Sequence, residues 1–300
     1  MGIYRISRPS LISFSGGRTS GYLLKKIIDA YEGKLPYDII VCFANTGKED
    51  ERTLQFVKDV EENWGVEIWW CEYVRDETKP PVVWKGKSPL VGQHAMRTVT
   101  FETASRSGEP FEQLIDVLAE YRKIAKNEPS VLPNPVQRIC SSQLKIRTMG
   151  RFMERLGFKK FSTALGIRYD EPSRAAPLLS CGIKYGDHLL PLYDARVTEP
   201  MVMEFWKTQP FDLGLQHDKE LGTYEGNCDF CFLKKNAKIK RLAQERPNDL
   251  KWWAEQEKRT GANFKKNRFT YTDLLEGRVP LGIVEKDDDG KEQEACFCTD

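Results

Sequence analysis

The sequence predicts an α/β fold with an open, mostly parallel sheet flanked by helices, in the Rossmann-like manner, followed by a helical, cysteine-containing C-terminal region. Three observations support this fold class. A short apolar strand at 11–14 runs through a glycine turn into a helix. The run 38–44 has the length and the β-branched content of a strand that is buried on both faces, as in parallel sheets. Between these strands, apolar residues recur at helical spacing, namely Leu23, Leu24, Ile27, Ile28 and Tyr31.

The alternation of strand and helix continues along the chain. Leu54, Val57 and Val60 stand three apart in an expected helix at 51–63, and 66–71 has the pattern of a third strand. Strands that alternate with crossover helices form a parallel sheet, whose ligands lie beyond the carboxyl ends of the strands. Two polar segments follow strands in this way, Ser15-Gly16-Gly17 and Asn45-Thr46-Gly47.

The junction at 15–20 has the composition of a phosphate-binding loop. Its two glycines allow close approach of the backbone, and the amides at the start of the next helix favour an anion. The loop adds hydroxyl groups and one positive charge through Ser15, Thr19, Ser20 and Arg18. The chain contains no G-x-x-x-x-G-K-[ST], and no G-x-G-x-x-G follows a strand, so the commoner nucleotide loops are excluded. The alternative is a tight strand–helix turn without a ligand.

Length and charge set further bounds. Three hundred residues suggest one large α/β domain with an appended region, or two domains, and we expect boundaries near 200 and 284. A net charge of +2 does not by itself indicate nucleic-acid binding. No apolar run approaches the roughly 18 residues that span a bilayer, so we expect a cytoplasmic protein without membrane partners.

The cysteines fall into two groups. Cys42 and Cys71 lie in expected strands and are assigned to the core. Cys228 and Cys231 form a C-x-x-C pair, which can bind zinc or an iron–sulfur cluster. Cys140 is a candidate third ligand. Ser141 or Ser142 can cap a helix directly after it, and a thiolate at the start of a helix is stabilised by the helix dipole. The remaining cysteines are Cys181, Cys296 and Cys298.

The motifs together resemble the phosphoadenosine phosphosulfate (PAPS) reductase-like family of the PP-loop adenine-nucleotide alpha hydrolase superfamily. The resemblance covers about 10–235 and rests on the loop at 15–20, Gly166–Glu171, Pro191–Asp194, Thr198–Pro200 and the cysteines. It implies an adenine nucleotide, ATP or a sulfonucleotide, at the segments 15–20 and 45–47, with Arg168 on its phosphate or sulfate. The alternative for Arg168 is a surface ion pair. Thr19 and Asn45 replace aspartates of the family pattern, which leaves open how Mg²⁺, a further cofactor of such sites, is held.

The same resemblance implies a metal centre. Cys140, Cys228 and Cys231 would bind a 4Fe-4S cluster, with the fourth position filled by Cys181, a tail cysteine or a substrate sulfur. Ile139 stands where cluster-bearing reductases have another cysteine. Structural zinc and a plain reduced C-x-x-C pair are the alternatives.

The last segment, 285–300, is acidic, with seven carboxylate side chains and two lysines, and we expect it to be mobile. Its Cys296 and Cys298 are candidate catalytic thiols, since related reductases use a tail cysteine. The alternative is an incidental exposed dithiol.

Three functions remain open. The first is ATP pyrophosphate cleavage coupled to sulfur transfer, with a sulfur donor or thiol reductant as partner. Its acceptor could be a nucleic acid that contacts the basic run Lys234, Lys235, Lys238, Lys240 and Arg241, although a solvated helix face explains that run equally well. The second is a sulfonucleotide reductase, and the third is a non-catalytic nucleotide-binding protein. The oligomeric state stays open.

Overall fold

A computed structural model of the chain describes residues 2–79, 93–123, 131–180, 184–226, 228–266 and 268–281. Its main sheet has six strands in the order β4-β3-β2-β1-β5-β6. All neighbours are parallel except β3 and β4, which pair antiparallel. The predicted fold class, an open and mostly parallel sheet flanked by helices, is therefore confirmed. The strands are β1 (Ser10–Ser13), β2 (Ile39–Asn45), β3 (Trp69–Arg75), β4 (His94–Val99), β5 (Ser162–Ala164) and β6 (His188–Leu189).

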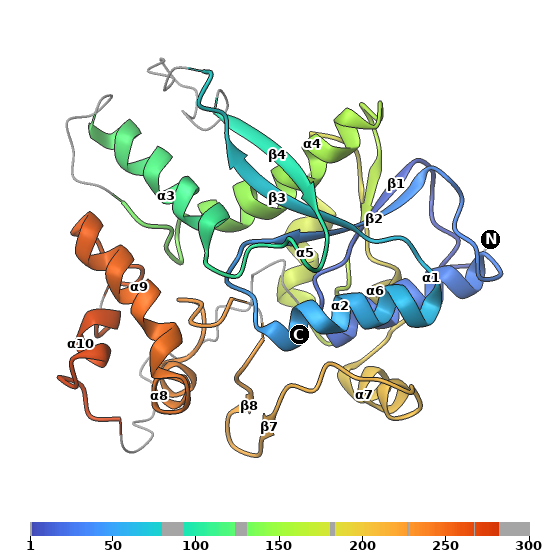
Figure 1. The fold of residues 1–300 in the computed structure, drawn as a ribbon. Coiled ribbons are helices and arrows are strands. Elements are labelled where there is room, and N and C mark those ends of the chain that lie inside the picture. Colours follow the sequence, from blue (N-terminus) through green and yellow to red (C-terminus); the bar gives the residue numbers. More distant parts are fainter. Residues whose placement is uncertain are drawn as a thin grey trace.

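Helices cover both faces of this sheet (Figure 1). On one face, α1 (Arg18–Ala30) and α2 (Glu51–Trp64) bury the apolar residues that the sequence placed at helical spacing, such as Leu24, Ile27 and Val57. On the other face, Met149 and Phe152 of α4 (Thr148–Arg155) pack on the strands. Cys42 and Cys71 are fully buried beneath α4, as predicted. The remaining elements of this part are α3 (Glu109–Tyr121), the π-helical segment η3 (Ser141–Arg147), α5 (Pro172–Ser180), α6 (Pro191–Asp194) and α7 (Glu199–Lys207).

The C-terminal region is mainly helical and has its own core. It comprises β7 (His217–Asp218), β8 (Gly222–Thr223), α8 (Asn236–Glu245), α9 (Pro247–Thr260) and α10 (Tyr271–Leu275). Trp253, Phe264 and Tyr271 are fully buried there and share one apolar cluster with Phe111 of α3. The helices α8–α10 therefore lie beside α3 and not beside α1 (Figure 1).

Two predicted elements differ from the structure. The third strand begins at Trp69 and not at 66, because the Ile68 N–H donates to the Glu61 carboxylate and so ties this segment to α2. Farther along the chain, β5 ends at Ala164, and the Ile167 N–H donates to the Leu165 carbonyl in the loop that follows.

The helix after Cys140 is also not capped by a serine. Cys140 itself already has helical dihedral angles, and Ser142 Oγ donates to the Ile139 carbonyl. The helix therefore begins before the two serines, and its first turns, through Arg147, are π-helical.

The domain boundaries near 200 and 284 stay predictions. The first falls inside α7, whose Val202 and Trp206 belong to the same core as α1 and α2. The second lies outside the described residues.

Candidate nucleotide site

The loop at 15–20 connects β1 to α1 and is held by its own hydroxyl groups. Ser20 Oγ donates to the Gly17 carbonyl at 2.9 Å and accepts from Ser15 Oγ at 2.9 Å. Gly16 has a φ of +77°, and a Cβ there would lie 2.7 Å from Cγ2 of Thr53 on α2. The glycine is thus required both by the left-handed backbone and by the close packing of the loop on α2.

The loop lies where the strand order reverses. From β1 the chain proceeds to β2 and β3 on one side, while β5 and β6 lie on the other side of β1. In open α/β sheets, ligands bind at this point, beyond the carboxyl ends of the strands. The loop after β5 meets the loop at 15–20 here, since a Cβ on Gly166 would lie 3.1 Å from Cα of Ser20.

The two arginines predicted for this site lie differently. Arg168 Nη1 donates to Thr19 Oγ1 at 3.1 Å, so its guanidinium reaches the start of α1. Asp170 also accepts from Arg168 Nε at 2.9 Å. Arg18, in contrast, forms a bidentate ion pair with Asp212, in which Nε donates to Oδ1 at 2.7 Å and Nη2 donates to Oδ2 at 2.5 Å. Arg168 thus contacts the start of α1 and also forms the ion pair expected as its alternative, with Asp170.

A cavity of about 150 Å³ opens beside the loop, between the sheet and the helical segment η3–α4. Its walls are mostly apolar, with Leu11, Met149 and Leu165 among the lining residues, and Ser15 and Lys145 also border it. His188 lines the cavity as well, and burial lowers the pKa of its imidazole. The arrangement joins an apolar chamber to a loop suited to an anion.

The second predicted segment begins at Asn45, the last residue of β2, whose side chain forms hydrogen bonds within the protein. Asn45 is fully buried, and its Nδ2 donates to Glu72 Oε1 at 2.6 Å and to the Ser105 carbonyl. Its Oδ1 accepts from the Gly47 N–H at 3.0 Å. Glu72 is itself fully buried and paired with Arg97. All polar atoms of the Asn45 side chain are thus used within the protein.

Thr46 connects this segment to a cysteine. The Thr46 backbone N–H and its Oγ1 both contact the carboxylate of Glu49, at 2.9 Å. Thr46 Oγ1 also lies 3.4 Å from Cys228 Sγ. Lys145 Nζ, which comes from η3, is 3.7 Å from Glu49 Oε1. Burial, together with the nearby charge of Glu49, raises the pKa of the Cys228 thiol well above its ordinary value.

A buried ion pair and backbone hydrogen bonds hold the turn at Cys228 against the loop after β2. Cys228 and Glu49 form a backbone bridge, and the Asp229 N–H donates to the Lys48 carbonyl at 2.8 Å. The Lys48 ammonium pairs with the Asp229 carboxylate at 2.9 Å, and both side chains are buried. Trp253 Nε1 donates to the same carboxylate at 2.6 Å. These contacts tie the C-x-x-C turn to both the sheet and the C-terminal core.

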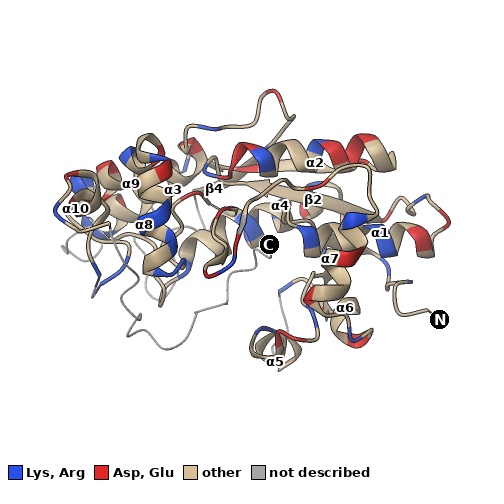
Figure 2. Ribbon diagram, turned by 90° about the horizontal axis from the view of Figure 1, so that it is seen from below, with Lys and Arg blue, Asp and Glu red and all other residues tan. Residues whose placement is uncertain are grey.

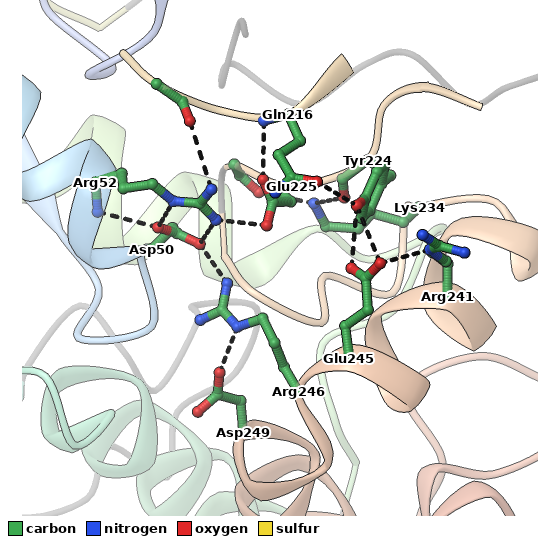
Figure 3. A network of polar contacts seen from close by, with 12 residues as sticks. Asp50, Arg52, Gln216, Tyr224, Glu225, Lys234, Arg241, Glu245, Arg246 and Asp249 are labelled. Atoms are coloured by element: carbon green, nitrogen blue, oxygen red, sulfur yellow. Dashed lines mark hydrogen bonds and ion pairs between the residues drawn. The ribbon is translucent and has the colours of Figure 1, made fainter. Parts of the chain in front are cut away.

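A larger polar network supports the same junction (Figure 3). Asp50, the N-cap of α2, receives hydrogen bonds from Arg52 and pairs with Arg246 at the junction of α8 and α9. Burial would raise the pKa of Asp50, but the hydrogen bonds from Arg52 and the charges of both arginines lower it to about 2. Arg52 also pairs with Glu225, just before the C-x-x-C turn.

The predicted metal ligands are only partly brought together. The Cys231 N–H donates to the Cys228 carbonyl at 3.1 Å, so the pair forms one turn, and Cys140 and Cys228 pack against the same apolar cluster. Within the described ranges, no group of three or more His, Cys, Asp or Glu residues is arranged to hold a metal ion. The assignment of Cys140, Cys228 and Cys231 as metal ligands therefore stays a prediction. Cys181, Cys296 and Cys298 lie outside the described residues.

The basic residues at 234–241 have local partners. Lys234 Nζ donates to the carbonyls of Tyr224 and Gly226, and Lys238 Nζ donates to the Thr223 carbonyl. Arg241 pairs with Glu245 on the same helix. In the part of the chain that the structure describes, no helix is long and apolar enough to cross a membrane.

Sequence reasoning missed Glu49 and Lys145. Both are polar residues among others in their segments, and none of the sequence motifs includes them. Glu49 and Lys145 are neighbours only because the loop after β2 packs against η3 in the folded chain. The signal that could have pointed to Glu49 is its position three residues after Thr46, at the carboxyl end of a predicted strand.

The fold defines an α/β protein with a loop rich in glycine and hydroxyl groups at the junction of β1 and β5. Among curated proteins, the chain is similar to an uncharacterized nin region protein, ORF290, of Escherichia phage lambda, with 28% identity over 232 residues. The match covers 77% of this chain and 68% of that protein. No family model matches the chain.

Two solved structures are among those that the chain resembles. One is the PAPS reductase of Candida auris in a phosphate complex, with 14% identity, a TM-score of 0.39, and coverage of 72% of this chain and 86% of that one. The other is the U34-tRNA thiolase NcsA of Methanococcus maripaludis with its [4Fe-4S] cluster, with 14% identity, a TM-score of 0.41, and coverage of 99% and 85%.

Proposed function

We propose that the chain is a PAPS reductase-like PP-loop enzyme that binds ATP and cleaves it between the α- and β-phosphates. The observation that carries this proposal is the position of the loop at 15–20. It lies at the reversal of strand order, and Arg168 reaches it from the loop after β5. A phosphate at this point would face the amino terminus of α1 and a guanidinium group, both of which favour an anion.

The apolar cavity beside the loop suits the base of the nucleotide. Leu11, Met149 and Leu165 line a chamber that Ser15 connects to the loop. A flat heteroaromatic ring would fill such a chamber, since ligand sites combine apolar walls with a few polar groups. Lys145 borders the cavity and would meet the charged part of a bound nucleotide.

The proposed reaction has two steps. An acceptor oxygen attacks the α-phosphorus, an oxygen–phosphorus bond forms, and the bond to the β-phosphate breaks with release of pyrophosphate. A hydrosulfide sulfur from a donor then bonds to the activated carbon of the acceptor, the carbon–oxygen bond breaks, and AMP leaves with the oxygen. The protein's part is to orient the phosphates and to stabilise the developing negative charge through the loop amides and Arg168.

The sulfur step is supported by the position of Cys228. Its thiol lies 3.4 Å from Thr46 Oγ1, at the carboxyl end of the strand next to the loop. The iron–sulfur cluster, and zinc as its alternative, stay predictions, and no step above runs through either. Iron, sulfide and zinc analysis of anaerobically purified protein tests whether Cys228 and Cys231 bind a cluster or zinc.

Parallel assays test the proposal. We expect pyrophosphate release from ATP and no sulfite release from PAPS, with Arg168→Ala losing about 10- to 100-fold in ATP affinity because a charge-assisted hydrogen bond contributes about 1.5–3 kcal/mol. Arg8→Ala is the matched control, since Arg8 pairs with Asp38 at the surface. Sulfite release without pyrophosphate would identify a sulfonucleotide reductase instead. Nucleotide binding without either product would favour a non-catalytic role.

A further inference from the structure

A groove lies away from the loop at 15–20, near the point where the parallel strand β3 begins. It has a volume of about 520 Å³ and lies where the end of α2, the start of β3 and the end of β4 meet. Trp69, Trp70 and Phe101 form its aromatic part. The nucleotide site does not use any of these residues.

The groove has an acidic rim. Among the described residues that line it are four glutamates and a single basic residue, Lys58, whose Nζ lies 3.9 Å from Glu62 Oε1. Lys58 Nζ lies 3.3 Å from Glu102 Oε1 and 4.6 Å from the centre of the Phe101 ring. The other three glutamates are Glu61, Glu62 and Glu67. Acidic residues lie along α2 in Figure 2, and the groove therefore attracts a cation.

The indole N–H of Trp70, a residue that lines the groove, is a buried hydrogen-bond donor without an acceptor among the described residues. Its side chain is almost fully buried, with the residue 3% exposed, and its Nε1 has no hydrogen-bond partner within the described residues. The ring packs edge-on against Phe43 and Phe101, at centroid distances of 4.9 and 6.1 Å. A buried indole N–H is usually bonded, so the missing acceptor points to a ligand.

The neighbouring strand favours an extended occupant. Thr98 and Val99, which line the groove, end β4, and β4 is the outermost strand of the sheet as far as the structure describes it. Extended peptides commonly bind beside such an edge strand.

We propose that this groove binds an extended, lysine- or arginine-bearing peptide segment of a protein partner. The cationic heads would pair with the rim glutamates, and their aliphatic stems would lie beside Val99 and the edge of the Phe101 ring. A peptide carbonyl would accept from Trp70 Nε1. A compact organic cation could satisfy the charge but offers no carbonyl to the indole.

The test uses the full chain and a fluorescein-labelled, acetylated hexapeptide of alternating lysine and valine. Fluorescence anisotropy measures its binding to the wild type, Glu67→Lys, Glu102→Lys and Glu255→Lys proteins. Glu255 is an exposed residue of α9 outside the groove, so its variant is the matched control. The indole N–H signal of Trp70, assigned by its absence in Trp70→Phe, is followed by nuclear magnetic resonance during titration.

We expect each reversal in the groove to weaken binding about three- to tenfold, because an attraction is replaced by a repulsion. Glu255→Lys should bind like the wild type, and the Trp70 indole signal should shift on saturation. Absence of binding, equal losses in all three reversals, or an unmoved indole signal would overturn the proposal. It would also be overturned if spermidine displaced the peptide and shifted the same signal, because the site would then be one for small cations.

Discussion

Replacing Asp50 with asparagine removes the central charge of the network between α2 and the C-terminal helices. The Asp50 side chain is only 4% exposed, and its pKa is lowered from 3.8 to about 2. At about 1.36 kcal/mol per pKa unit, the charged form contributes about 2 kcal/mol to the free energy of unfolding. Asparagine caps a helix nearly as well as aspartate, so the substitution isolates the charge from the cap.

The expected pH dependence follows from the direction of this shift. Because folding lowers the pKa, the stabilisation is fully present above about pH 4, the unfolded value, and is lost as the pH falls towards 2. Urea unfolding of the wild type and Asp50→Asn should therefore differ by about 2 kcal/mol at pH 7 and converge near pH 2. Equal stability of the two proteins at pH 7, or a difference that persists unchanged at low pH, would refute the reasoning.

Three further predictions concern the site and its support. Gly16→Ala should destabilise the fold by about 1–3 kcal/mol in thermal unfolding, more than Gly33→Ala, because both have positive φ but only Gly16 lacks room for a Cβ. Equal losses would show that packing at Gly16 has no effect. Asp229→Ala should cost about 3–5 kcal/mol, because it leaves the Lys48 ammonium buried without its partner; a melting temperature within a degree of the wild type would contradict this. Arg168→Lys should retain part of the ATP affinity that Arg168→Ala loses, measured by titration calorimetry, and complete loss in both would argue against a charge role.

Local patterns were sufficient to predict the core of the fold. The apolar run before Asn45 and the spacing of Leu24, Ile27 and Val57 determine which faces are buried, and these features need no knowledge of distant contacts. The loop at 15–20 was predictable for the same reason, since its glycines and hydroxyl groups interact with each other within six residues.

Contacts between distant segments could not be predicted. Nothing near Arg18 in the sequence indicates that Asp212 would hold it, and the role of Asn45 depends on the buried Glu72 of the next strand. The same limit applies to the cysteines. Their spacing shows that Cys228 and Cys231 share a turn, but the contact of Cys228 with Thr46 arises only from tertiary packing.

Titration calorimetry of ATP into the wild type and Gly17→Val proteins tests most directly whether the loop at 15–20 is a nucleotide site. We expect the wild type to bind with a Kd of about 1 µM to 1 mM, a range usual for enzyme substrates. Gly17→Val should lose measurable binding while its melting temperature shows that it remains folded. The same Kd in both proteins would contradict the assignment of the loop.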